Sequence, residues 1–567
     1  MSLFASFSAS ASGLLINRLG MSVTGNNIAN VNTPGYARQR LDLSPITPSQ
    51  FGSVSVGPGV RADDVRSVVD SYLIERGREA KSEFESASGR LDIVQRIEGV
   101  FNELSDTDLS SQLDAFFDSV ADVQNNPLEV GVRGVAVQNA VTLAETVQGI
   151  NERLRDIQQD INTEVESSVD AINRSLDRIK DLNSQIVAAT GGIAQDGDAA
   201  GLRDLRDQEL TTLSGLVEIQ THEDLNGSIN IYSGENYLLI SGQVQHVDVT
   251  QSVEDGVPRS SLVFANSRAE VPLGGGRLGG LQTARDEDLA SAMDRLDTFA
   301  SNLIFEANKI QSSGQGLESF TEVTSTGSVI DRFAALNSPD AGLPFPIRNG
   351  FFELRVAETT GQEVTYTIPV TLDGVTSDSL DDVATNINTI TGIPNFATIS
   401  GGKLTLDAPT DVSFTFGEDN TDLLAAIGVN TLFTGSLASD IGVNERLREQ
   451  PALLSASRNG NPGDTSNIVA LGNLRSESVG TLGGLSLTDY LAESVQQLGN
   501  GAQAAQAQTE ILQSTSLSLE SQSLAITGVS LDEEVLKLTQ FQRAFQASAR
   551  HISVVNELID EVLNLAS

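Results

Sequence analysis

The stretch INERLRDIQQDINTEVESSVDAINRSLDRIKDLNSQI, residues 150–186, decides the fold class. Its apolar residues recur at steps of three and four, which places them on one face of a helix: Ile150, Leu154, Ile157, Ile161, Val165, Val169, Ile172, Leu176, Ile179, Leu182 and Ile186. With residues 135–147 this stripe predicts one helix of roughly 55 residues, about 80 Å long. Only partner helices bury so long a stripe, so the sequence predicts a long helical bundle.

Outward from this helix, the chain offers both partner helices and strands. Helical patterns are predicted at 202–213, 286–310 and 487–524, and residues 216–250 alternate around Asn226-Gly227, a hairpin signal. Strand-like runs at 351–356, 364–370, 403–406 and 412–416 are separated by Gly, Pro and Asp turns. We therefore expect a multidomain, mainly α protein with β-rich portions, in which residues 326–436 form a β-rich insertion.

Both ends of the chain carry helical stripes. The polar run Thr24–Asn27 and the turn-rich residues 30–35 are expected to end the N-terminal helix. Pro34 and Gly35 favour a tight turn near Thr33–Tyr36. The C-terminal stripe follows strict four-three steps, as in a coiled coil: Leu531, Val535, Leu538, Gln542, Phe545, Ala549, Ile552, Asn556, Ile559 and Leu563. Its partner is either the N-terminal helix or another molecule, and the pattern leaves both open.

These patterns predict five parts along the chain. They are an N-terminal helix and turn (1–60) pairing with 525–567, a helical body (61–325) with a small β portion near 216–283, the β-rich insertion (326–436), a return of the helical body (437–524), and a C-terminal helix (525–567). The expected architecture is thus a terminal α-helical coiled coil, a long helical-bundle body and an insertion that points outward.

Charge narrows the range of functions. The 567 residues contain 35 Lys and Arg against 76 Asp and Glu, a formal charge of −41 that disfavours binding to nucleic acid or acidic membranes. Residues 1–60 carry Arg18, Arg38 and Arg40 against Asp42, or +2, which leaves −43 for the remainder. No basic residue precedes Arg18, so a cleaved signal peptide is not expected, and no apolar window is long enough for a membrane span.

Motifs for chemistry are weak. Gly274, Gly276 and Gly279 match the spacing of a dinucleotide loop, but no βαβ pattern surrounds them, so a Gly-rich strand-to-helix turn is the favoured interpretation. The histidines His222, His246 and His551 lie far apart in the sequence, and the absence of Cys removes thiolate chemistry. We expect no enzymatic activity, no cofactor and no metal.

The two ends carry a more specific signal. Residues 26–36, NNIANVNTPGY, resemble the signature of the bacterial flagellar axial proteins, which are the rod, hook and hook-associated subunits. Residues 528–534, GVSLDEE, and 540–550, QFQRAFQASAR, resemble the matching C-terminal motif, with Phe545 where that family more often has Tyr. The form LDEE at 531–534 and the internal segments 202–219 and 435–444 favour the hook-associated subunits over the hook and rod subunits.

The resemblance implies a structural subunit of the flagellum that joins hook to filament through helices that become ordered on assembly. Its implied partners are copies of itself in a ring, hook subunits, the next hook-associated protein on the filament side, and an export chaperone at the C-terminal helix. It further implies type III export without a cleaved signal and an extracellular location. The implied N-terminal interface residues are Phe4, Phe7, Ala11, Leu14, Leu15, Asn26, Asn27, Ala29, Asn30, Thr33, Pro34, Gly35 and Tyr36. The C-terminal ones are Leu531, Val535, Leu538, Phe541, Phe545, Ala549, Ile552, Ile559 and Leu563.

Two alternatives stay open at this stage. A hook or rod subunit would share the same terminal motifs. An extracellular adhesin or hydrolase would carry its function in the 326–436 insertion, which bears little of the resemblance.

Overall fold

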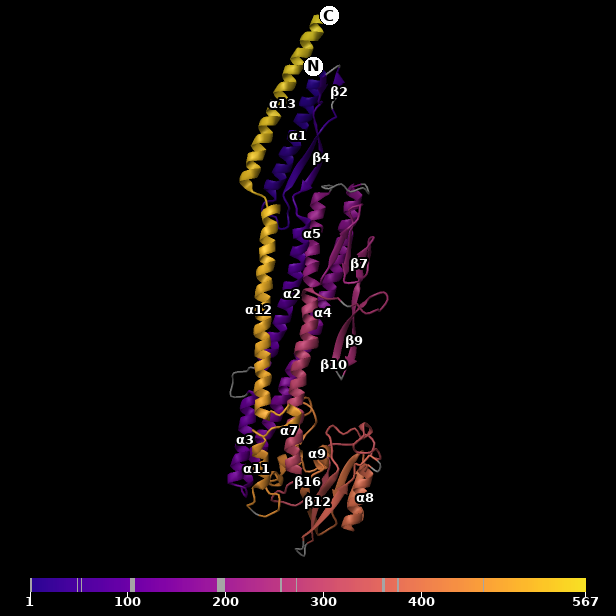
Figure 1. Cartoon of the computed structure of the whole chain (residues 1–567), viewed down its shortest axis with the longest axis vertical. Helices are drawn as coiled ribbons and strands as arrows, with labels where there is room; N and C mark the ends of the chain where they lie inside the picture. Colours follow the sequence, from indigo (N-terminus) through magenta and orange to yellow (C-terminus); the bar gives the residue numbers. More distant parts are fainter. Residues whose placement is uncertain are drawn as a thin grey trace. The chain divides into compact units, whose positions relative to one another are not determined.

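The computed structural model describes residues 3–47, 49–51, 54–101, 108–190, 199–254, 257–271, 273–358, 363–374, 377–461 and 463–566 (Figure 1). The chain divides into two compact units. The first comprises Met1–Ile93, Gln159–Arg285 and Ala504–Ser567, and the second comprises Val94–Gln158 and Asp286–Gln503. The five-part division expected from the sequence stays a prediction.

Helices dominate the first unit. They are α1 (Leu3–Ala29), α5 (Ala200–Leu216), α6 (Gly276–Thr283) and α13 (Leu531–Ala566), together with parts of α2 (Ser71–Phe101), α4 (Val130–Thr190) and α12 (Leu487–Thr527), which contribute to both units. Its strands form four antiparallel sheets: β1 (Gln39–Pro45) with β4 (Val60–Ser67), β2 (Ser49–Phe51) with β3 (Val54–Val56), β9 (Val247–Glu254) with β10 (Val257–Phe264), and the meander β5 (Gln220–Glu223), β6 (Ile229–Ser233), β7 (Asn236–Ile240), β8 (Gln243–Val244).

The long helix predicted from the opening stripe is α4, which has 61 residues. Ten of the eleven stripe residues are at most 6% exposed; the exception is Leu182, which is half-buried. The neighbouring Asn183 is buried in its place, at 3% exposure. Its amide donates to the carbonyl of Ile229 at 2.9 Å and accepts from the Ile229 N–H at 3.1 Å, so strand β6 explains why a polar residue lies on the apolar face.

The second unit joins helices to small sheets. Its helices are α3 (Leu109–Asn125), α7 (Ala290–Ser312), α8 (Leu380–Thr391), α9 (Leu423–Ile427), α10 (Glu445–Glu449) and α11 (Ser466–Asn473), with a π-helical turn (Ala284–Leu289) before α7 and 3-10 turns at Pro339–Ala341, Pro451–Leu453 and Gly480–Leu482. Its strands are β11 (Glu322–Thr324), β12 (Gly350–Glu358), β13 (Glu363–Val370), β14 (Ala397–Ser400), β15 (Lys403–Asp407), β16 (Val412–Asp419), β17 (Phe433–Thr434) and β18 (Gly442–Val443). The strands predicted in the insertion are all present.

The core of the insertion is aromatic. Strand order is β13-β12-β16 in one sheet and β11-β15-β14 in the other. The rings of Phe320, Phe396 and Phe416 surround Phe414, with centroids 5.2 to 6.0 Å from its own. Helix α8 begins at a capping box in which Ser379 and Asp382 bond each other's backbone N–H, which fixes the start of the helix.

One detail of the N-terminal helix differs from the expectation. Helix α1 runs through the polar residues Thr24–Asn27 and ends at Ala29, directly before the turn-rich residues 30–35 that were also expected to end it. Thr24 and Asn27 are both buried, at 2% and 1% exposure. Buried polar side chains with hydrogen-bond partners are compatible with a helix interior, and the partners of Asn27 lie on other segments, which a local pattern does not show.

Candidate assembly interface of the terminal helices

The two ends of the chain meet in one antiparallel helix pair, α1 with α13, which we call the terminal pair (Figure 1). Its register is fixed by two polar contacts. The Ser10 hydroxyl lies 2.7 Å from His551 Nδ1, and the Asn27 amide donates to Glu534 Oε2 at 2.9 Å. Seventeen residues forward on α1 (27 − 10) correspond to seventeen back on α13 (551 − 534), so both contacts belong to the same register.

Small residues at seven-residue steps let the two helices approach closely. A side-chain carbon added to Gly20 would lie 2.6 Å from Cε1 of Phe541, and one added to Gly13 would lie 3.3 Å from Ser548 Oγ. Gly13, Gly20 and Asn27 are thus equivalent positions along α1. The aromatic ring of Phe541 occupies the space that any larger residue at position 20 would need.

Burial along α13 gives its inner face. The residues that are buried or half-buried there at alternating steps of four and three are Glu534, Leu538, Phe541, Phe545, Ser548, Ile552, Val555 and Ile559. Among the predicted interface residues, Leu538, Phe541, Phe545, Ala549, Ile552 and Ile559 are buried or half-buried, whereas Leu531 and Val535 are 48% and 50% exposed. The side chain of Leu563 lies outside the described residues. Sequence reasoning missed Glu534 and Val555, which an apolar four-three pattern beginning at Leu531 does not include.

The predicted residues of α1 divide in the same way. Phe7, Ala11 and Leu14 are half-buried, Leu15 is exposed, and the side chain of Phe4 lies outside the described residues. Ile16 and Gly20 are buried although the sequence did not single them out.

A tight turn follows α1, as the sequence predicts. The N–H of Tyr36 donates to the carbonyl of Thr33 at 3.2 Å, and Gly35 has a φ of +75°. This is the conformation that a Pro-Gly pair favours at the centre of a β-turn. Asn30 supports the turn by donating to the Asn26 carbonyl at 3.0 Å and accepting from the Thr33 hydroxyl at 3.1 Å.

The turn segment, residues 30–39, is tied to the terminal pair through the buried side chain of Asn27. Its amide nitrogen donates to the Gln39 carbonyl at 2.8 Å as well as to Glu534. Its amide oxygen accepts from the Gln39 N–H at 2.9 Å and from the Tyr36 hydroxyl at 2.8 Å. Every hydrogen-bonding position of this amide is therefore used, which makes it a well-satisfied buried polar group.

Charged contacts complete the connection to α13. Glu534 is 1% exposed, and Lys537 donates to its second oxygen at 2.7 Å. Arg38 bonds the exposed Glu533 at 3.0 Å, and its backbone N–H donates to the carbonyl of Thr527, the last residue of α12, at 2.8 Å. The turn segment thus contacts the end of α12, the start of α13 and the end of α1.

Burial keeps the Tyr36 hydroxyl a hydrogen-bond donor. Desolvation raises the pKa of Tyr36 to about 12, and the nearby carboxylates of Asp204 and Glu534 act in the same direction. The phenol is therefore protonated at neutral pH. It remains able to donate to Asn27.

Not every predicted interface residue is brought into this cluster. Asn26, Ala29, Thr33, Pro34 and Gly35 are exposed, whereas Asn27 bonds Glu534 and Tyr36 has the Glu534 carboxylate as a charged neighbour.

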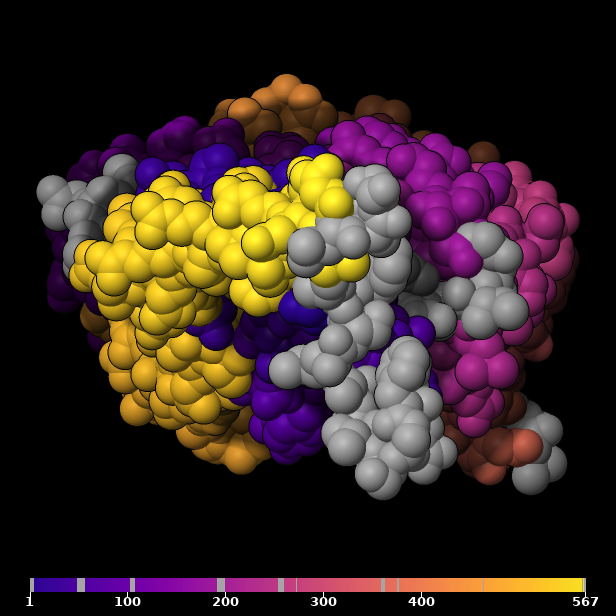
Figure 2. All heavy atoms as spheres, turned by 90° about the horizontal axis from the view of Figure 1, so that it is seen from above, coloured from indigo at the N-terminus to yellow at the C-terminus, as the bar shows by residue number. Residues whose placement is uncertain are grey.

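The terminal pair also leaves an uncovered side. Seen from the end at which both termini lie, α13 (yellow) occupies the surface beside residues of the N-terminal segment (indigo) (Figure 2).

The candidates for chemistry do not converge. The Gly274–Gly279 segment enters α6, where a side-chain carbon on Gly276 would lie 2.4 Å from the backbone of Leu216, so the glycine permits close packing. His246 faces Asp177 and His551 faces Ser10. Among the described residues, no group of three or more His, Asp or Glu side chains has the arrangement of a metal site.

Comparisons with known proteins match the same elements. The family models described as Flagella basal body rod protein and Flagellar basal body rod FlgEFG protein C-terminal match residues 8–36 and 520–565. These ranges cover α1 with its turn, and the end of α12 with α13. The model described as Flagellar hook-associated protein FlgK helical domain matches residues 94–324. The terminal pair therefore lies where the chain is similar to the bacterial flagellar axial proteins.

Relatives narrow the class further. Proteins named Flagellar hook-associated protein 1 from Escherichia coli (strain K12) and Bacillus subtilis (strain 168) are each 25% identical to this chain. The first alignment covers 98% of this chain and 98% of the relative, and the second covers 97% and 96%. Over nearly its whole length the chain is thus similar to proteins of the flagellar hook-associated protein 1 family. The flagellar hook junction protein FlgK from Burkholderia pseudomallei, at 15% identity, shares the fold with a TM-score of 0.52 over 80% of this chain and 100% of that one.

Proposed function

We propose that this chain is a structural subunit at the junction between hook and filament, like the hook-associated proteins to which it is similar. It assembles when its two terminal helices become ordered against each other and against neighbouring subunits. The two ends of one chain form a single helix pair whose outer face still carries large apolar side chains. That observation carries the proposal, because exposed apolar surface of this kind marks a protein interaction site.

The uncovered residues lie on both helices of the terminal pair. On α13 they are between 43% and 65% exposed: Leu531, Val535, Leu536, Val554, Leu558 and Val562. On α1, Leu15 and Leu19 are 59% and 37% exposed. A pair of helices buries only one stripe on each member, so neighbouring subunits are needed to cover these residues.

Partners follow from this surface. Copies of the same chain in a ring, hook subunits on one side and the next hook-associated protein on the other would together cover the terminal pair. Before assembly, an export chaperone would cover the apolar face of α13. Within the described residues, no helix combines the length and apolarity needed to cross a membrane.

Export without cleavage also fits the pair. The contacts described above that fix the register with α13 come from residues 10–27 of α1. Removal of an N-terminal signal of about 20 residues would remove most of this helix. We therefore infer that the mature extracellular protein keeps its N-terminus.

The test is complementation of a strain that lacks the gene. We expect the deletion strain to form hooks and to release filament subunits into the medium, and the full chain to restore filaments. A chain ending at residue 530 should fold, as judged by circular dichroism, yet fail to restore them. Filaments attached through the truncated chain would refute the assembly mechanism, and long hook-like tubes of this chain alone would point to a hook subunit.

A point variant separates surface chemistry from folding. Leu558→Gln removes an exposed apolar side chain of α13, and Gln546→Asn changes an exposed polar residue of the same helix. We expect Leu558→Gln to reduce motility in soft agar and Gln546→Asn to leave it unchanged. Equal motility of the two strains would contradict a role for the apolar face.

A further inference from the structure

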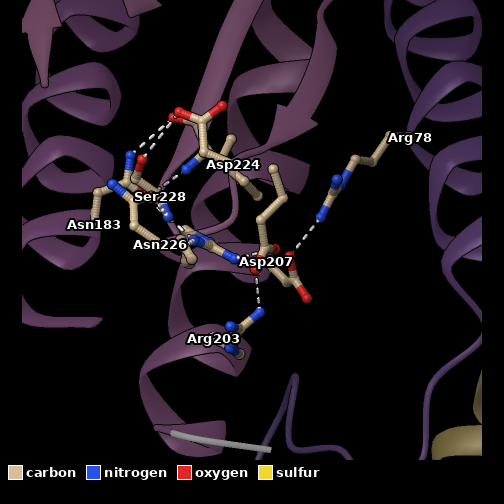
Figure 3. A network of polar contacts seen from close by, with 11 residues as sticks. Arg78, Asn183, Arg203, Asp207, Asp224, Asn226 and Ser228 are labelled. Carbon is tan, nitrogen blue, oxygen red and sulfur yellow. Dashed lines mark hydrogen bonds and ion pairs between the residues drawn. The ribbon is translucent and has the colours of Figure 1, made fainter. Parts of the chain in front are cut away.

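The segment Arg203–Gln208 in α5 directs its side chains to two sides of the helix. On one side it is anchored to the neighbouring elements of the first unit (Figure 3). Arg206, which is 2% exposed, donates to Asn183 Oδ1 at 3.1 Å and to the Gly227 carbonyl at 2.7 Å. Asp207 pairs with Arg78 of α2 at 2.8 Å. These contacts hold α5 firmly against α2, α4 and the β5–β6 hairpin.

The other side of the same segment meets the turn segment and β4. The Asp204 carboxyl accepts a hydrogen bond from the Ser67 hydroxyl at 3.2 Å, and the backbone N–H of Ala37 lies near enough to favour the ionised form of the carboxyl. One turn further along α5, a side-chain carbon on Gly35 would lie 3.7 Å from Cδ of Gln208. Asp204 is thus a polar contact on the side of the anchored helix that faces β4 and the turn segment.

We propose that Asp204 is a positioning residue, a latch between α5 and the turn segment that tightens when its carboxyl binds a proton and loosens when it ionises. The observation behind the proton dependence is geometric. Oδ2 of Asp204 is buried and has no hydrogen-bond partner among the described residues. A proton on the carboxyl removes the charge that this buried oxygen would otherwise carry without a donor.

The surrounding charges favour the protonated form. Asp207 lies on the same helix, and the Tyr36 phenol on the turn segment has both Asp204 and Glu534 of α13 as charged neighbours. Arg78 pairs with Asp207 and Arg206 pairs with Glu223, while the hydroxyl of Ser67 on β4 gives Asp204 a neutral donor. Burial, the largest cause, raises the pKa of Asp204 to about 6.

The sign of the pH dependence follows. The pKa of Asp204 is higher when the turn segment is docked on α5 than when it is released. Protonated Asp204 therefore stabilises docking fully below the ordinary pKa of 3.8, and this stabilisation is lost as the pH rises through about 6. The two pKa values correspond to at most about a hundredfold change in the docking equilibrium. Because solvent reaches part of the group, we expect a change on the order of tenfold.

Hydrogen exchange of the purified full-length chain, read by mass spectrometry, tests the latch. The reporter is the peptide containing the amides of Ala37 and Arg38, with each protection factor referred to the intrinsic rate at the same pH. We expect its protection to fall about tenfold between pH 4.5 and 7.5. In Asp204→Asn the amide mimics the protonated acid, so protection should be independent of pH and remain near the acid value.

Two further variants keep the outcome decisive. Asp207→Asn, the matched carboxyl on the anchored side, should retain the step with a slightly lower midpoint. Ser67→Ala removes a hydrogen bond that favours the Asp204 carboxylate, so the pH midpoint of the protection step should rise. This variant tests the latch even where Asp204→Asn fails to fold. A flat wild-type profile, a step that persists in Asp204→Asn, or exchange of the reporter at the intrinsic rate at every pH would each overturn the latch. None of these results bears on the proposed role in the flagellum, because no assembly is involved.

Discussion

The buried amide of Asn27 is the point at which the terminal pair is most sensitive to a single substitution. In Asn27→Ala, four groups lose their partner at once: Glu534 Oε2, the N–H and carbonyl of Gln39, and the Tyr36 hydroxyl. Lys537 still bonds the other oxygen of Glu534, so the carboxylate keeps one contact. The Gln39 backbone groups and the Tyr36 hydroxyl belong to half-buried residues and lose their contact with Asn27.

The magnitude follows from these losses. A buried polar group left unpaired costs about 1–3 kcal/mol, and removing the partner of a buried charge costs about 3–5 kcal/mol. These free-energy costs do not simply add, because a single opening of the helix pair lets water reach several of the groups. We therefore expect a total cost of about 3–5 kcal/mol for Asn27→Ala. The opening equilibrium of the terminal pair would then rise about 150-fold to 5,000-fold.

Hydrogen exchange of amides 13–27 in the full-length chain measures this opening. Asn26→Ala is the matched control, because Asn26 is an exposed asparagine whose side chain bonds Asn30 and Gln39 at the surface. We expect the control to change protection by less than about tenfold. Glu534→Gln should reduce the cost of Asn27→Ala by about 1–3 kcal/mol, since no buried charge is then left unpaired. An equal loss of protection in Asn27→Ala and Asn26→Ala would refute the reasoning.

Three other changes have expected outcomes. Gly20→Leu should weaken the pair by about 2–3 kcal/mol relative to Gly25→Leu, because a side-chain carbon at position 20 meets the ring of Phe541, whereas one at position 25 meets no other segment within 4 Å. Equal exchange rates in α13 of the two variants would argue against the close approach. In absorbance at 295 nm, one of the six tyrosines should titrate near pH 12, and this step should be missing in Tyr36→Phe. Because the pKa of Tyr36 is raised in the folded protein, its contribution to stability is complete below about pH 10 and is lost as the pH rises toward 12. Above about pH 10 the melting temperature of the wild type should therefore fall more steeply than that of the variant. Asn183→Leu should lower the free energy of unfolding by about 2–4 kcal/mol although it extends the apolar stripe of α4, because the N–H and carbonyl of Ile229 both lose the Asn183 amide. A variant that melts at a higher temperature than the wild type would show that the amide is dispensable.

Periodicity predicted most of the fold and failed at two comparable places. The stripe of α4 and the strands of the insertion were found because their apolar residues repeat over many turns or alternate between clear turn signals. On α4 the pattern selected Leu182 where Asn183 is buried, and on α13 it selected Val535 where Glu534 is buried. An apolar pattern cannot assign a polar residue to a helix seam, because what makes its burial favourable is a partner distant in sequence: Ile229 for Asn183 and Asn27 for Glu534.

The candidate interface shows the same division. The two terminal motifs identified both ends of the contact, but they did not show that residues 27 and 534 touch or that the turn segment also reaches Thr527. Those contacts depend on the relative register of two helices separated by most of the chain. Local spacing contains no information about that register.

A polar contact fixes this register where apolar packing alone would not. The inner faces of α1 and α13 contain Ser, Gly and Ala at several positions, so neighbouring registers differ little in the apolar area they bury. A slip of one heptad would place Glu534 opposite Gly20 and leave its carboxylate buried without the Asn27 amide, at a cost of about 3–5 kcal/mol. It would also detach Tyr36 and Gln39 from Asn27, and with them the turn that contacts α12. Only one register therefore satisfies the buried polar groups, and in that register the exposed residues of α1 and α13 present one defined surface to the neighbouring subunits.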